Sequence, residues 1–129
     1  MLFGLLEKEF KPCFEKLHPK FYFYPEFFHD FINLNMPERL KVEAKIADMY
    51  RNPQVLSNTR PYPVETPTDA VREFPFSKKG RIYYIPGEPR GYQCGIIRLS
   101  RTEREQKRVI AWLQLNLWSF RHWASVLNL

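Results

Sequence analysis

The sequence has few cysteines and no long uncharged run, and each shortage excludes a class of protein. Two cysteines in 129 residues cannot supply a disulfide framework, and a chain that is 44% hydrophobic does not need one to fold. The longest stretch without a charged residue, Val109 to Phe120, is too short and too polar to cross a bilayer. We therefore expect no transmembrane helix and two reduced, buried thiols.

Recognisable motifs of catalysis and cofactor binding are also missing. Gly87, Gly91 and Gly95 are spaced by four among prolines, which matches neither a phosphate-cradling loop nor a dinucleotide fingerprint. Only Cys13 and His18 form a local pair of zinc-binding type, and a zinc site needs more ligands than that. No nucleophile motif is evident. We expect a non-enzymatic protein with no catalytic residue, no metal site and no cofactor.

The start of the chain does not have the pattern of a secretory signal. Residues 1–6 are apolar, but no basic residue precedes them and charged residues follow at once. We expect an intracellular, cytoplasmic location.

Positive charge is concentrated in the C-terminal part of the chain. Residues 1–51 hold eight Lys and Arg against eight Asp and Glu, and residues 52–77 hold two against three. Residues 78–129 hold ten against three, so the net charge of +6 comes wholly from this part. An anionic partner is therefore expected there.

Hydrophobic periodicity predicts that residues 1–51 are helical. Apolar residues recur at steps of three and four up to Leu17, but Pro12 lies inside this pattern and predicts a kink or two short helices. Pro25 is placed to open a second helix. Asn35, followed by Pro37, marks the start of a third helix, which we expect to reach about Arg51.

Residues 52–77 contain five of the eleven prolines, which force extended backbone and remove hydrogen-bond donors. Loops of this length are uncommon in compact domains. We expect the segment to cross the surface of the domain, held by apolar anchors at Tyr62, Val64, Val71, Phe74 and Phe76.

The last part, 78–129, reads as a hairpin followed by a long helix. Residues 81–85 and 92–99 are rich in β-branched and aromatic residues, and the segment between them is rich in proline and glycine. Ile96 and Ile97 point to opposite faces, so we expect packing on both sides of the hairpin. Thr102 with Glu105, or Ser100 with Glu103, fits a capping box at the start of a helix that continues to about Leu127.

These elements predict a single α+β domain of N-terminal helices, a Pro-rich crossing loop, a β-hairpin and a long C-terminal helix. Its three parts are residues 1–51, 52–77 and 78–129.

The leading functional hypothesis is contact with the phosphate backbone of a nucleic acid. Lysine and arginine neutralise phosphates, and exposed tyrosines can stack on unpaired bases. The candidate residues lie in the hairpin-to-helix region: Lys78, Lys79, Arg81, Arg90, Arg98, Arg101, Arg104, Lys107 and Arg108, with Tyr83 and Tyr92. The opposing interpretation is that these charges only keep the protein in solution.

The alternative hypothesis is a structural or adaptor subunit of a larger assembly. Aromatic residues are favoured at the centres of protein interfaces, and this chain has many. A protein partner or a second copy of the chain would then contact the aromatic helices through Phe27, Phe28, Phe31, Trp112, Trp118 and Trp123. The sequence leaves open whether these side chains form a core or an interface.

Overall fold

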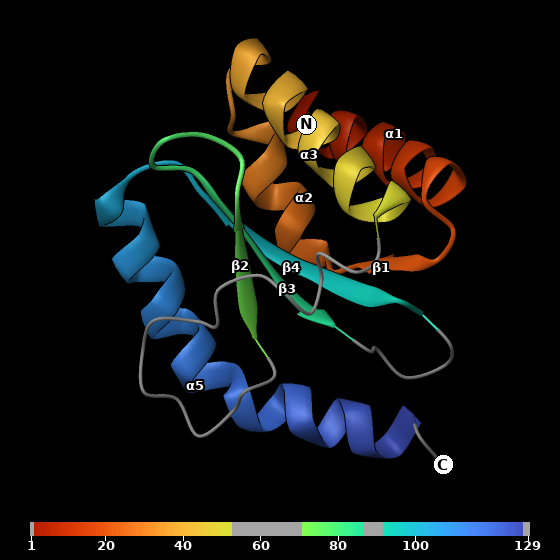
Figure 1. Ribbon diagram of the computed structural model, residues 1–129, viewed down its shortest axis with the longest axis vertical. Coiled ribbons are helices and arrows are strands. Elements are labelled where there is room, and N and C mark those ends of the chain that lie inside the picture. Colours follow the sequence, from red (N-terminus) through yellow and green to blue (C-terminus); the bar gives the residue numbers. More distant parts are fainter. Residues whose placement is uncertain (1, 53–70, 87–91, 128–129) are drawn as a thin grey trace.

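The computed structural model describes the backbone of residues 2–52, 71–86 and 92–127, and the side chains of residues 9–52, 71–85 and 92–116. Helices precede and follow a group of strands along the chain (Figure 1). The elements are α1 (Leu2–Leu17), β1 (Phe21–Phe23), α2 (Pro25–Ile32), α3 (Met36–Arg51), β2 (Arg72–Pro75), β3 (Arg81–Pro86), β4 (Cys94–Ser100) and α5 (Glu103–Leu127).

Four strands form one mixed sheet with helices on both faces. The strand order is β1-β4-β3-β2, with β1 parallel to β4 and the other two pairs antiparallel. Helices α1, α2 and α3 cover one face, and α5 lies on the other (Figure 1). The α+β class, the hairpin of β3 and β4 and its packing on both sides are therefore confirmed.

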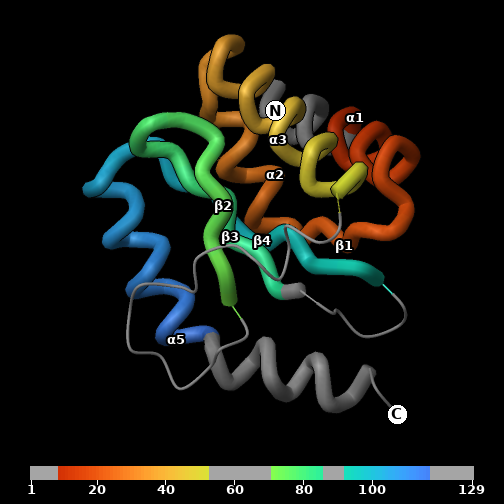
Figure 2. The backbone as a smooth tube through the Cα atoms, in the orientation of Figure 1, coloured from red at the N-terminus to blue at the C-terminus, as the bar shows by residue number. Residues whose placement is uncertain are grey.

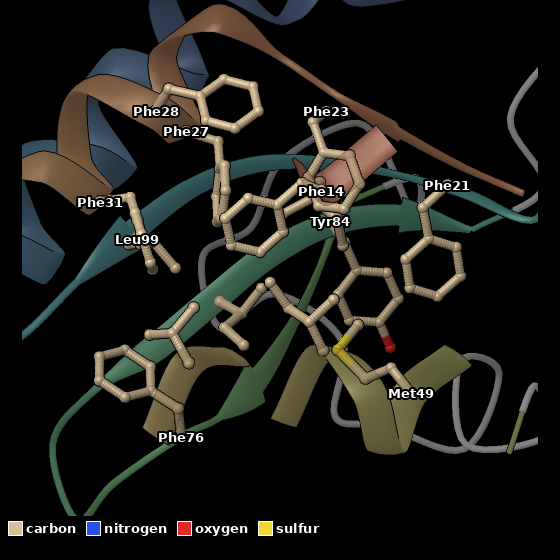
Figure 3. Packing of buried hydrophobic residues seen from close by; sticks show 14 of the residues in the cluster. Phe14, Phe21, Phe23, Phe27, Phe28, Phe31, Met49, Phe76, Tyr84 and Leu99 are labelled. Atoms are coloured by element: carbon tan, nitrogen blue, oxygen red, sulfur yellow. The ribbon is translucent and has the colours of Figure 1, made fainter. Parts of the chain in front are cut away.

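The larger core lies between the sheet and the three N-terminal helices, and it is built mainly from phenylalanine. Phe14 of α1 stands at its centre, with its ring centroid 5.1 to 5.4 Å from those of Phe23, Phe27 and Phe31. Figure 3 shows these rings between the helices and the strands. Aromatic pairs prefer such tilted and edge-to-face arrangements, which add to the stabilisation from burial.

The smaller core lies under α5. It consists of the buried residues Tyr24, Val71, Tyr83, Ile97, Val109 and Leu113. Successive side chains of β3 enter different cores, because Ile82 and Tyr84 face the larger core while Tyr83 between them faces the smaller one.

A β-bulge in β4 changes the direction of one side chain. Tyr83 pairs with Arg98 and Tyr84 with Ile96, so Ile97 is an extra residue in β4. Bulges re-aim the side chains beside them. Here Arg98 lies toward α5, with its guanidinium carbon 4.8 Å from the ring centroid of Trp112.

The predicted helix starts agree with the structure. Pro25 occupies the first turn of α2, and Asn35 and Glu38 form both hydrogen bonds of a capping box at α3. At α5 the Thr102 hydroxyl accepts a hydrogen bond from the Glu105 amide at 3.2 Å. The Glu105 carboxylate, however, accepts from the amide of Arg101 rather than closing a box on Thr102.

Several expectations need correction. Helix α1 is continuous from Leu2 to Leu17, so the alternative of two short helices is wrong, and Leu17 is 69% exposed. Cys94 is buried as expected, but Cys13 is exposed because the larger core is reached by Phe14 instead.

Two short strands were not predicted. The segment 72–75, expected within the crossing loop, is strand β2, and 21–23 is strand β1. Pro75 is compatible with a strand because β2 lies at the edge of the sheet, where the backbone N–H groups on its outer side have no neighbouring strand to bond. Of the loop anchors, Val71 and Phe76 are buried, and Tyr62 and Val64 lie outside the described residues.

Candidate functional site

The predicted basic residues divide into two groups according to what surrounds them. Arg81, Arg98 and Arg101 are held by acceptors of the protein itself. Five others are exposed, and together they are called the basic strip: Lys78, Lys79, Arg104, Lys107 and Arg108. Arg90 lies outside the described residues.

The basic strip comes from two segments that meet in space. Lys78 and Lys79 lie in the turn between β2 and β3, and the other three residues lie in the first two turns of α5. The Lys79 ammonium approaches the Glu103 carboxylate at 4.0 Å, which places the turn beside the start of α5. Figure 2 shows the two segments side by side.

Helical spacing puts the α5 part of the strip on one face. Residues 104, 107 and 108 are three and four positions apart and all are exposed, while Val109 and Leu113 are buried against the sheet. Burial of the apolar side thus turns the cations outward. In the part of the chain with described side chains, no ion pair within 4.0 Å neutralises Arg104, Lys107 or Arg108.

The turn that carries Lys78 and Lys79 is fixed by Gly80. Its amide donates to the Ser77 hydroxyl at 2.8 Å, and its carbonyl accepts from the Phe76 amide at 3.1 Å. A methyl group on Gly80 would lie 2.5 Å from the buried Phe76 ring. A glycine is required here because a side chain has no room.

Arg81 takes no part in the strip because it closes this same turn. Its guanidinium donates to the carbonyls of Ser77, Lys78 and Gly80 at 2.8 to 3.3 Å. It also lies 3.8 Å from the carboxylate of Glu73, which is 3% exposed. Arg81 is a structural residue of the turn.

Arg98 is likewise engaged. Its Nε donates to Asp30 Oδ2 at 2.7 Å and its Nη2 donates to Asp30 Oδ1 at 3.2 Å, so the two side chains form a bidentate pair. Asp30 also accepts from the Leu99 amide at 2.8 Å. Burial nevertheless raises the pKa of Asp30, against the opposing effects of Arg98 and Leu99.

Arg101 is held by Glu105 one turn along the chain. Its guanidinium donates to both carboxylate oxygens at 2.6 to 3.1 Å. These hydrogen bonds lower the pKa of Glu105 and raise the pKa of Arg101. Because two contacts fix a planar guanidinium, Arg101 presents a plane of defined orientation.

The two predicted tyrosines are not available to stack on a base at the strip. Tyr83 is fully buried and its hydroxyl lies 3.2 Å from that of Ser100; burial raises its pKa to about 12. Tyr92 is half-buried against Tyr22 and precedes β4, whereas the strip lies beyond the other end of that strand. The length of β4 separates them by about 20 Å.

The aromatic residues predicted as an interface also have different surroundings. Phe27, Phe28 and Phe31 are at most 1% exposed and belong to the larger core, so they offer no surface to a partner. Trp112 is half-buried over Arg98. The side chains of Trp118 and Trp123 lie outside the described residues.

A polar cleft of about 330 Å³ lies beside the strip, where α2, β4 and the start of α5 meet. It is called the α2–α5 cleft. Its walls carry two carboxylates and three guanidinium groups over an apolar floor: Asp30, Asn33, Leu34, Arg98, Leu99, Arg101, Glu105, Arg108 and Val109. Arg108 belongs to both the cleft and the strip.

Sequence reasoning missed the acidic and amide residues of this cleft. One signal was present, because Asp30 is the only charged residue between Glu26 and Glu38, within a run of large apolar residues. An acidic residue in such a run is typical of a buried pair. Nothing in the sequence names Arg98, 68 positions away, as its partner.

The described part of the chain contains no group of three or more metal-ligating side chains, and no helix in it is long and apolar enough to cross a membrane. Comparison of the chain with family models, curated proteins and solved structures found no match.

Proposed function

We propose that the basic strip binds the phosphate backbone of a nucleic acid and that the protein acts by binding rather than by catalysis. The observation that carries this proposal is the division of the cations. Three arginines are neutralised within the fold, while five cations on two adjacent segments are exposed. Charges that only kept the chain in solution would not need to gather on one edge.

The chemistry of the strip suits phosphates. Each exposed lysine or arginine that meets a phosphate releases a condensed counterion, so affinity falls steeply with salt. The Glu103 carboxylate lies 4.0 Å from the Lys79 ammonium, and it offsets one of the five charges only in part, since both side chains are more than half exposed.

A binding role is favoured over catalysis by the engagement of the cleft carboxylates. Asp30 and Glu105 each accept from a guanidinium and a backbone amide. A general acid or base needs an oxygen directed at substrate, and these oxygens are directed at arginines.

The test is charge reversal on the strip with a matched control. The double variant R104E/K107E lowers the net charge by four, and so does K11E/K16E, whose sites are exposed on α1 across the sheet. Affinity for generic DNA and RNA is measured by fluorescence polarisation. We expect the strip variant to lose at least tenfold in affinity and the control to lose far less. Equal losses would show that only net charge matters.

The assembly hypothesis is the second candidate, and one observation favours it. Leu115 is 85% exposed on α5, at the end of the described side chains. Sedimentation equilibrium of the wild type and of Leu115→Lys tests it. A dimer that the substitution dissociates supports an assembly role, and a monomer in both cases contradicts this contact.

A further inference from the structure

We propose that the α2–α5 cleft receives an unpaired nucleobase, so that the nucleic acid bound by the basic strip is single-stranded. This inference rests on the proposed function. It concerns what the cleft adds to the strip, and the two can fail separately.

The charges inside the cleft do not suit a phosphate. Asp30 neutralises Arg98 at 2.7 Å, and Glu105 neutralises Arg101 at 2.6 Å. Only Arg108 is left over, at the boundary with the strip. The interior is therefore nearly neutral and polar while the strip beside it is cationic, which places an anion outside and an uncharged polar group inside.

The shape and the walls of the cleft suit a flat heterocycle. Its volume of about 330 Å³ lies at the lower end of the roughly 300–1,000 Å³ found for small-molecule sites. The planar guanidinium of Arg101, whose orientation is fixed by its hydrogen bonds to Glu105, offers a face for stacking. Leu34, Leu99 and Val109 supply an apolar floor.

One side chain at the mouth can read the edge of a base. Asn33 is exposed at the C-terminus of α2, and its Nδ2 donates to the His29 carbonyl at 2.9 Å. This bond fixes the amide, whose oxygen is an acceptor for the amino and imino groups of bases. A duplex keeps its bases stacked and paired, so only an unpaired base can enter.

The chain provides a matched control for this residue. Asn52 ends α3 as Asn33 ends α2, is also exposed, and its Nδ2 likewise donates to the carbonyl four residues back, at 3.2 Å. Asn52 does not line the cleft. Replacement of either asparagine by leucine removes the same local hydrogen bond, but only Asn33→Leu replaces an amide in the wall of the cleft by an apolar side chain.

The experiment compares three DNA ligands of equal length: a mixed-sequence single strand, the same strand with every base removed, and the duplex. The abasic strand keeps all the phosphates, so it reports on the strip alone. We expect the base-bearing strand to bind about tenfold more tightly than the abasic strand, the order that one stacked base contributes. We expect Asn33→Leu, which removes the acceptor for the base edge, to reduce this advantage and Asn52→Leu to retain it.

The outcomes separate the two proposals. Equal binding of base-bearing and abasic strands, with both weakened by R104E/K107E, would overturn the cleft inference and leave the strip in place. A preference for the base-bearing strand that Asn33→Leu leaves unchanged would also overturn it, because the base would then not contact Asn33 in the cleft. Salt-independent or absent binding of all three ligands would overturn both.

Discussion

The carboxylate of Asp30 accepts two hydrogen bonds from the guanidinium of Arg98, with donor–acceptor distances of 2.7 and 3.2 Å, and so joins α2 to β4. The same guanidinium lies 4.8 Å from the ring centroid of Trp112 in α5. One arginine therefore connects all three layers of the fold. The bulge at Ile97 makes this contact available, because it aims Arg98 toward α5.

Asp30→Asn should destabilise the protein by about 2 kcal/mol, because it removes charge-assisted hydrogen bonds and leaves a largely buried guanidinium without its counterion. Both side chains are only 19% exposed. The free energy of unfolding from urea titration measures the effect.

Asp48→Asn is the matched control for that substitution. Asp48 pairs with Arg51 at 2.8 Å on the surface of α3, where the two side chains are 47% and 70% exposed. A loss below about 0.5 kcal/mol is expected from such a pair. Similar losses at Asp30 and Asp48 would mean that the Asp30–Arg98 pair does not join the layers.

Gly80→Ala should cost about 1–3 kcal/mol, since the added methyl group would lie 2.5 Å from both the Phe76 ring and the Ser77 hydroxyl. The turn that carries Lys78 and Lys79 would have to shift. Thermal unfolding measures the loss, and Lys78→Ala in the same turn should change stability little. An unchanged Gly80→Ala protein would show that the turn is looser than described.

The buried His18 ring should make the protein less stable at mildly acidic pH. Burial lowers the pKa of His18 below 6.5, so the folded state keeps the ring neutral while the unfolded chain takes up a proton. The contribution of the neutral His18 ring to the free energy of unfolding is thus fully present well above pH 6.5. It is lost as the pH falls below that value, by up to about 1.4 kcal/mol per pH unit.

Removal of that titration should flatten the pH profile. In His18→Phe the slope of stability against pH below 6.5 should decrease relative to the wild type, as measured by urea unfolding at successively lower pH. The new ring would still pack on Phe14, Phe21 and Tyr50. Identical slopes in the two proteins would rule out His18 as the group responsible.

The buried hydroxyl of Tyr83 should make the protein less stable at alkaline pH. Burial raises its pKa from 10.0 to about 12, so the unfolded chain loses this proton before the folded protein does. Stability should fall as pH rises between these two values, by about 1.4 kcal/mol per pH unit. Tyr83→Phe should have a shallower fall over the same range; parallel curves would contradict the burial of an ionisable hydroxyl at this position.

Local signals in the sequence were sufficient for most helices and for the hairpin. Pro25 and Asn35 mark helix starts through the chemistry of a single turn, and the β-branched and aromatic runs mark β3 and β4. Strands β1 and β2 were missed because they have three and four residues, too few for a period. The partner of β1 is also distant in sequence, since Phe21 pairs with Cys94, whereas β2 pairs with β3 across a short turn.

The same distinction applies to the candidate site. The sequence identifies a group of basic residues between Lys78 and Arg108, but it treats all of them alike. Arg98 is removed from the strip by Asp30, which is 68 positions away and is reached only through the fold. Arg101 is removed by Glu105 one turn along α5, a pairing that helical spacing could have indicated.

The most direct test of the proposed function is the salt dependence of single-stranded oligonucleotide binding by the wild-type protein. If the five cations of the strip each meet a phosphate, the logarithm of the association constant should fall with the logarithm of salt concentration with a slope of about −3.5. R104E/K107E should reduce the steepness of that slope. Binding that is indifferent to salt, or a slope that the strip variant leaves unchanged, would contradict a phosphate-binding strip.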